Sequence, residues 1–193
     1  MKISILLPFK ENFSPSYAGA VSLFINETLK ISKYKNSTIV YGNTEYKNTF
    51  NLKYTNITLK NIFFQSQNRK YVEEFVKLEK KRKSDLIELH NRPIYLSYLT
   101  KELHNKTFIL YFHNDPLTMS GSKKIKERIF LLKNCFKIIF NSNWSKRRFL
   151  DGMKSDYINS DKLIVINQSA RKNYIDLNKK KNIITFVGKL NKS

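Results

Sequence analysis

The chain contains little of several residue types that mark special classes of protein. Its 193 residues include 1 cysteine, 5 glycines and 4 prolines. The single cysteine, Cys135, excludes an internal disulfide, and no zinc-ligand spacing is present, so we expect no metal site and a reducing, cytoplasmic setting. Scarce glycine and proline exclude a low-complexity or collagen-like chain. No segment approaches the roughly 20 apolar residues that a membrane-spanning helix needs.

Acidic residues are also scarce. There are 15 of them against 36 basic residues, which gives a formal net charge of +21. The basic residues are spread over several predicted helices and form no tail. Such a surface attracts polyanions and anionic membranes, and compositional drift in a chain rich in lysine, asparagine and isoleucine explains the charge equally well. The charge supports an anionic partner, such as the inner face of a membrane in peripheral contact, without identifying it.

Short apolar segments alternate with amphipathic helical segments along the whole chain. Hydrophobic residues make up 41% of it, which is a globular composition. Strand and helix in alternation predict an α/β fold with a Rossmann-like, mostly parallel sheet flanked by helices. Residues 48–64 are strand-like but irregular. The expected strands lie near residues 2–9, 37–41, 85–89, 107–112, 135–140, 163–166 and 183–187, and the expected helices near 19–32, 68–83, 94–104, 123–134 and 144–153.

Two of the expected strands end in the same pattern, His-Asn-x-Pro. It occupies residues 90–93 after the strand at 85–89, and residues 113–116 after the strand at 107–112. Only one helix fits between the two, and strand, helix, strand is the unit that makes parallel neighbours. Both turns should therefore emerge at the carboxyl edge of the sheet, where open α/β sheets bind ligands.

The second turn offers three groups for a sugar-like ligand. His113 can hydrogen-bond a substrate hydroxyl or polarise a leaving phosphate. Asn114 and Asp115 add an amide and a carboxylate. The alternative is a turn in which the Asn and Asp side chains satisfy their own backbone.

The first turn is similar. Arg92 can hold an anionic group, while His90 and Asn91 either face the same ligand or cap the helix whose first position Pro93 suits.

Two further helix starts follow predicted strands. Gly19 and Ala20 are small enough to let a ligand approach the amides of a helix N-terminus, a natural phosphate site. They do not form the GxGxxG dinucleotide motif, so an ordinary helix start explains them too. At the end of the strand near 135–140, Ser142 or Asn143 can cap the next helix.

Together these segments resemble the N-terminal domain of family 4 glycosyltransferases, which have the two-domain GT-B fold. The resemblance covers nearly the whole chain and follows the order of its motifs. It rests on the loop at residues 19–20 and on residues 89–93, 112–116 and 139–145, and it ends with residues 186–190.

The resemblance implies transfer of a sugar from a nucleotide-activated donor, with retention and without a required metal or other cofactor. Residues 1–180 resemble the acceptor-side domain, and residues 181–193 the first strand and loop of an incomplete donor-binding domain, so the chain alone is expected to be inactive. His113 corresponds to the family's active-site histidine. Gly19 and Ala20 correspond to its donor-phosphate loop. Lys189 stands where the family usually has an arginine that touches the diphosphate.

The remaining turn residues are expected on the acceptor side of the site: His90, Asn91, Arg92, Asn114 and Asp115.

The resulting hypothesis is a cytoplasmic enzyme of surface polysaccharide or lipopolysaccharide synthesis, with a nucleotide sugar and a saccharide or lipid-linked acceptor as partners. One alternative is a non-catalytic remnant that binds a sugar or a partner without turnover. Another is a nucleic-acid-binding module, suggested by the charge together with 14 phenylalanines and 11 tyrosines. Most of these aromatic residues fall where a core is expected, and no nucleic-acid-binding motif appears, so we expect no nucleic acid partner.

Overall fold

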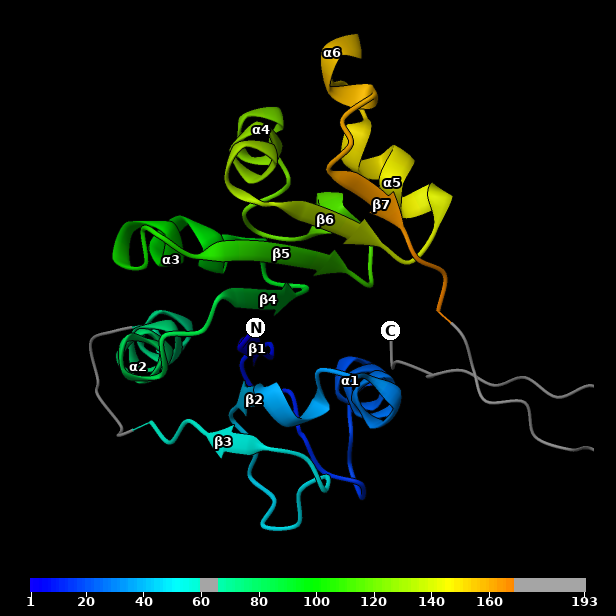
Figure 1. Ribbon diagram of the computed structural model, residues 1–193. Coiled ribbons are helices and arrows are strands. Elements are labelled where there is room, and N and C mark those ends of the chain that lie inside the picture. The colour runs from blue at the N-terminus through cyan, green and yellow to red at the C-terminus, as the bar shows by residue number, and fades with distance from the viewer. Residues whose placement is uncertain (60–65, 169–193) are drawn as a thin grey trace, which may run out of the picture.

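The computed structural model describes residues 1–59 and 66–168. They form a sheet of seven parallel strands in the order β3-β2-β1-β4-β5-β6-β7 (Figure 1). This confirms the α/β, Rossmann-like class. The predicted strand at 183–187 and Lys189 lie outside the described residues. The strands are β1 (Ile3–Leu6), β2 (Thr38–Gly42), β3 (Tyr54–Asn56), β4 (Leu86–His90), β5 (Thr107–Phe112), β6 (Lys137–Phe140) and β7 (Leu163–Val165).

Every helix expected within the described residues is present, with ends that differ by a few residues. Ser142 is the residue that caps α5, because its side chain accepts a hydrogen bond from the backbone N–H of Ser145. Within residues 1–59 and 66–168, no helix combines the length and the apolar character that crossing a membrane requires. The helices are α1 (Ala20–Ile31), α2 (Gln67–Arg82), α3 (Leu96–Glu102), α4 (Ile125–Asn134), α5 (Asn143–Leu150) and α6 (Ser155–Ile158), with short 3₁₀ turns at Lys35–Ser37, Pro93–Tyr95 and Pro116–Thr118.

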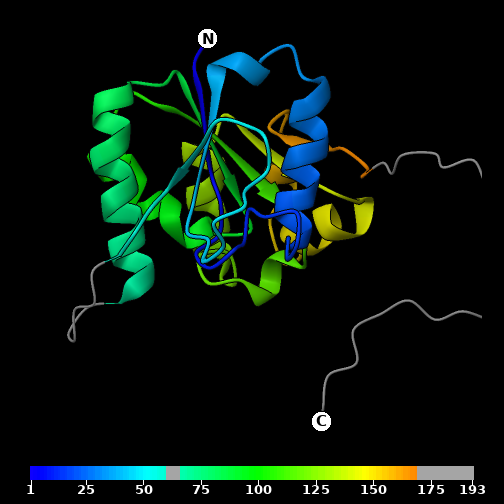
Figure 2. The same cartoon turned by 90° about the horizontal axis from the view of Figure 1, so that it is seen from below.

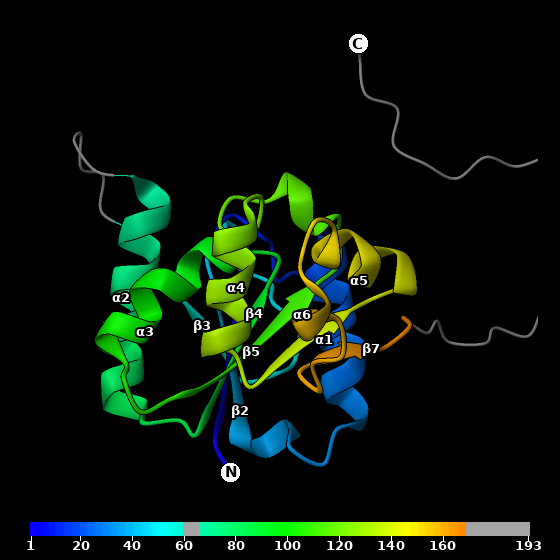
Figure 3. The same cartoon turned by 90° about the horizontal axis from the view of Figure 1, so that it is seen from above.

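Helices cover both faces of the sheet. Figure 2 shows α1 and α2 on opposite sides of the strands, and Figure 3 shows α3 and α4 on the same side as α2. Side chains alternate along each strand, so β5 sends Phe108, Leu110 and Phe112 into the larger core beneath α2, α3 and α4. A second, smaller core joins α1 to β1 and β2.

The order in which strands are added to the sheet reverses at β1. This strand pairs with β2 on one side and with β4 on the other, so the connections that follow β1 and β4 run to opposite halves of the sheet. The carboxyl ends of such neighbouring strands open a crevice, which is where ligands bind in doubly wound sheets. A ligand site is therefore expected among the residues that follow β1, β4 and β5.

Two local expectations are corrected. The prediction that His90 belongs to the turn is wrong, because β4 continues through it and His90 pairs with Tyr111 of β5. The turn begins at Asn91, whose backbone has φ +50°, a left-handed conformation that asparagine tolerates better than most residues. The strand-like region near 48–64 contributes only three strand residues, β3, among its described residues.

A buried carboxylate fastens α2 to the sheet. Glu79 has no exposed surface. One of its oxygens accepts a hydrogen bond of 2.6 Å from the hydroxyl of Ser4 in β1. The other accepts from the backbone N–H of Ser84 at 2.7 Å and from the hydroxyl of the same residue. These bonds supply the partners that a buried carboxylate requires.

Candidate functional site

The two histidines of the repeated pattern lie in contact at the carboxyl edge. His90 Nδ1 and His113 Nε2 are 2.9 Å apart, within hydrogen-bonding distance. His90 is completely buried, and His113 is partly exposed. Of the two histidines, only His113 has a surface that a ligand could contact directly.

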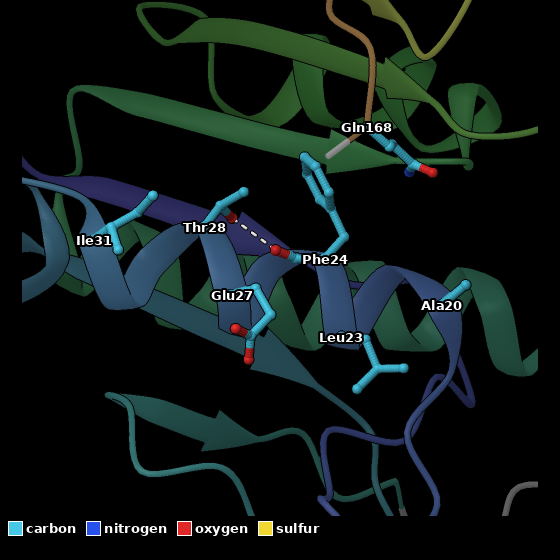
Figure 4. A pocket seen from close by; sticks show the side chains of 7 residues that line it. All are labelled: Ala20, Leu23, Phe24, Glu27, Thr28, Ile31 and Gln168. Atoms are coloured by element: carbon cyan, nitrogen blue, oxygen red, sulfur yellow. Dashed lines mark hydrogen bonds between the residues drawn. The ribbon is translucent and has the colours of Figure 1, made fainter. Parts of the chain in front are cut away.

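Aromatic rings surround His113. Its ring stacks on Tyr111 with centroids 4.4 Å apart, and the edge of Phe24 from α1 meets it at 5.1 Å. Figure 4 shows the ring of Phe24 extending from α1 towards the sheet, near Gln168. Burial, and secondarily the neighbouring His90 ring, lowers the pKa of His113 to about 3. The imidazole is therefore neutral at physiological pH and offers one acceptor and one donor nitrogen.

The backbone of His113 is held from both neighbouring strands. Its N–H donates to Asn91 Oδ1 at 2.8 Å, and its carbonyl accepts from Asn141 Nδ2 at 2.7 Å. Asn91 follows β4 and Asn141 follows β6, so these two amides join three consecutive strand ends. Asn141 also accepts a hydrogen bond from the hydroxyl of Ser145 in α5. The sequence pattern indicated capping at this point but not the bond to His113.

A pocket of about 600 Å³ opens beside the two turns. Amide, hydroxyl and guanidinium groups line it, which suits a hydroxyl-rich or anionic ligand. Arg92 donates to the carbonyl of Asn91 at 2.9 Å and forms no ion pair with any residue in 1–59 or 66–168. Three of the lining residues were predicted from the sequence, and the others were not; the full lining is Asn68, Asn91, Arg92, Ile94, Asn114, Thr118, Met119 and Ser120.

Asp115 uses both carboxylate oxygens within the protein. Oδ2 is 3.0 and 3.2 Å from two nitrogens of Arg148 in α5. Oδ1 accepts a hydrogen bond of 3.0 Å from the N–H of Leu117 and so caps the 3₁₀ turn that follows. Asp115 thus ties the second turn to α5, and its predicted contact with an acceptor stays a prediction.

The amino end of α1 already holds a carboxylate. Glu11 Oε1 accepts a hydrogen bond of 3.0 Å from the backbone N–H of Ser22. A Cβ atom on Gly19 would collide with that carboxylate, so glycine leaves the room that Glu11 occupies. Ala20 is exposed beside Phe24 and Gln168 (Figure 4). The predicted donor-phosphate role of Gly19 and Ala20 stays a prediction, at a position where an anionic group is in fact bound.

The described part of the chain thus gathers several of the residues predicted for the site. His90, Asn91, His113 and Asn114 meet at one edge, and α1 reaches this edge through Phe24. Among residues 1–59 and 66–168, no group of three or more His, Cys, Asp or Glu side chains could hold a metal ion. The chemistry available is hydrogen bonding by neutral groups and attraction of an anion by one arginine.

Several solved structures have a similar fold. HepE from Anabaena, solved with UDP and glucose, has a TM-score of 0.59 at 17% identity, over 88% of this chain and 45% of its own. A glycosyltransferase from Rickettsia africae has a TM-score of 0.58 at 18% identity, over 94% and 47%. MnaA from S. aureus, solved with UDP, has a TM-score of 0.53 at 12% identity, over 86% and 44%.

At these identities the likeness shows the fold alone. The chain spans less than half the length of each of these three proteins. No family model matches the sequence, and no curated protein matches it.

Proposed function

We propose that the chain is the acceptor-side part of a glycosyltransferase that takes its sugar from a nucleotide-sugar donor. This proposal rests on the carboxyl edge, where His113 precedes Asn114 of the polar pocket and its backbone is held by Asn91 of the same pocket. A neutral, backbone-anchored imidazole and a pocket of amides and hydroxyls at the same sheet edge suit the recognition of sugar hydroxyls. The similarity in fold to structures solved with UDP supports the choice of donor class.

Under this proposal, polar residues of the pocket have separate roles. Asn91 and Asn114 hydrogen-bond the hydroxyls of the acceptor. Arg92 attracts an anionic group on the acceptor, because it is the basic residue of the pocket lining. A lipid-linked diphosphate or an acidic saccharide meets that requirement. A membrane-linked acceptor also agrees with the net charge of +21, which draws the protein to an anionic membrane surface.

The remaining parts of the proposal follow the family resemblance. Transfer proceeds with retention, and the donor is a co-substrate rather than a bound cofactor. The donor binds mostly to a second domain that begins near residue 181, and its phosphates approach Gly19, Ala20 and Lys189. The product belongs to a surface polysaccharide or lipopolysaccharide that is assembled at the cytoplasmic face of the membrane.

The test is sugar transfer by the protein expressed from its full reading frame. A panel of nucleotide sugars is combined with saccharide and lipid-linked acceptors, and nucleotide release is measured. We expect turnover with one donor, and we expect His113→Ala to lower kcat/KM about 100-fold or more. The matched control is His104→Ala, which changes an exposed histidine in a turn and leaves the rate unchanged.

The same assay tests the acceptor side. Arg92→Gln should raise KM for an anionic acceptor and leave KM for the donor unaltered, whereas Arg147→Gln on the exposed side of α5 should change neither. Full activity of His113→Ala in an active enzyme refutes the role of the histidine. Sugar binding without turnover supports the non-catalytic alternative. Salt-dependent oligonucleotide binding above that of a charge-matched control supports the nucleic-acid alternative.

A further inference from the structure

Three polar side chains form a line at the carboxyl ends of β4 and β5. Glu88 and His90 lie two residues apart on β4, so both project from the same face of the sheet. Glu88 Oε1 is 2.8 Å from His90 Nε2. This contact is off the direction of a hydrogen bond, which leaves the buried Nε2 without a hydrogen-bond partner. The other ring nitrogen of His90 is the one 2.9 Å from His113 Nε2.

The charges along this line fix the position of each proton. A carboxylate close to an imidazole nitrogen repels a lone pair and attracts an N–H, so His90 carries its proton on Nε2. With one proton on the His90 ring, at Nε2, its Nδ1 atom is an acceptor. His113 must therefore donate to it from Nε2, which leaves His113 Nδ1 as an acceptor.

Gln168 gives independent support for this proton arrangement. Its side-chain nitrogen, which can only donate, is 2.8 Å from His113 Nδ1. The reverse arrangement would set an N–H of His113 against the amide N–H of Gln168. It would also set the lone pair of His90 against the carboxylate of Glu88. Both ends of the line therefore select the same tautomers.

We propose that Glu88 and His90 are positioning residues, which hold His113 as its neutral Nε2–H tautomer so that Nδ1 accepts a hydrogen bond from a hydroxyl of the sugar ligand. The identity of the ligand rests on the proposed function, whereas the tautomer does not. A ligand hydroxyl replaces the amide of Gln168 as the donor to Nδ1. The site thereby selects sugars that carry a donor hydroxyl at one position.

Nuclear magnetic resonance of the ¹⁵N-histidine-labelled protein tests the tautomers without any substrate. The chain has 3 histidines, so His90 and His113 are assigned by single substitutions. We expect both of them to give the pattern of a single Nε2–H tautomer near neutral pH. In Glu88→Ala, a fraction of the Nδ1–H tautomer should appear at both rings, and Glu88→Asp should restore part of the original pattern.

Matched controls separate a positioning role from a general loss of structure. Glu45→Ala changes an exposed carboxylate in a loop and should leave both tautomers as they are. Glu88→Gln keeps the volume of the side chain, so it serves if Glu88→Ala fails to fold, and it too should show mixed tautomers. An Nδ1–H tautomer at His113 in the unaltered protein overturns the proposal. Tautomers that stay the same in all three Glu88 variants overturn it as well.

A second measurement concerns the ligand. Donor sugars with one hydroxyl replaced by hydrogen are compared in binding to the full-length protein. One position should lose about tenfold to hundredfold in affinity, because the acceptor is left unpaired. The same change should cost far less in a His113→Ala variant. Correct tautomers with no sugar transfer refute the proposed function alone, whereas transfer by a protein with the wrong tautomers refutes the positioning role alone.

Discussion

Acidification should destabilise the fold through His113. Burial and the adjacent His90 lower the pKa of this histidine from 6.5 to about 3 in the folded protein. In the unfolded chain the pKa returns to about 6.5, so the unfolded state binds the proton first as the pH falls. Stability is therefore present in full above about pH 6.5 and decreases as the pH drops from there towards about 3.

The size of the effect follows from this difference in pKa. At about pH 5 the unfolded histidine is almost fully charged and the folded one is still neutral. The interval from the unfolded pKa of about 6.5 down to about pH 5 is roughly 1.5 pH units. It corresponds to a loss of about 2 kcal/mol in the free energy of unfolding. Other groups titrate in the same range, so the quantity to measure is the difference between the unaltered protein and His113→Gln.

Urea unfolding, followed by circular dichroism near pH 7 and near pH 5, measures this difference. The unaltered protein should lose about 2 kcal/mol more than His113→Gln over this interval. His104→Gln, at an exposed turn, should behave like the unaltered protein. Equal losses in the unaltered protein and in His113→Gln would refute the assignment of a neutral His113 in the folded state.

Three further changes test the packing around the site. Glu79→Ala leaves the hydroxyls of Ser4 and Ser84 and one backbone N–H without their buried acceptor. Urea unfolding should show a loss of about 3 kcal/mol, and a loss as small as that of exposed Glu45→Ala would contradict the role of Glu79 as the fastening of α2. Leu110→Ala empties a completely buried position in the larger core. We expect it to cost about 3 kcal/mol in the same assay, and a cost below that of a surface change would be inconsistent with a packed core there. Gly19→Ala displaces the carboxylate of Glu11 from the amino end of α1. The free energy of unfolding should fall by about 1 kcal/mol. If adding Glu11→Ala to Gly19→Ala lowers it by the same amount again, the two residues act independently and this explanation is wrong.

The sequence predicted the sheet well because buried parallel strands are continuous apolar runs. The sharing of one edge by residues 90–93 and 113–116 followed from the strand, helix, strand spacing alone. The strand boundary at His90 was missed, because the apolar run ends at Leu89 while the backbone ladder to β5 extends one residue further. Side-chain type carries no information on that last hydrogen-bonded pair.

The sequence did not predict which side chains the site residues contact. Alternation along β4 places Glu88 on the same face as His90, but nothing in the sequence brings His113 to that face at 2.9 Å. The pairing of Asp115 with Arg148 joins residues 33 positions apart, and the sequence offered a ligand role for the same carboxylate. Such contacts depend on how α1 and α5 dock on the sheet, which local patterns do not determine.

The carboxylate at the amino end of α1 has a thermodynamic consequence for any anion that binds there. Glu11 already accepts a backbone hydrogen bond at that position, so an arriving phosphate competes with a group that is covalently attached and always present. If this cap is worth about 1 kcal/mol, the apparent dissociation constant of the phosphate rises about fivefold over that of a vacant helix end. Binding also displaces the Glu11 side chain from the backbone N–H of Ser22, so a change in the environment of Glu11 would report that the anion has arrived.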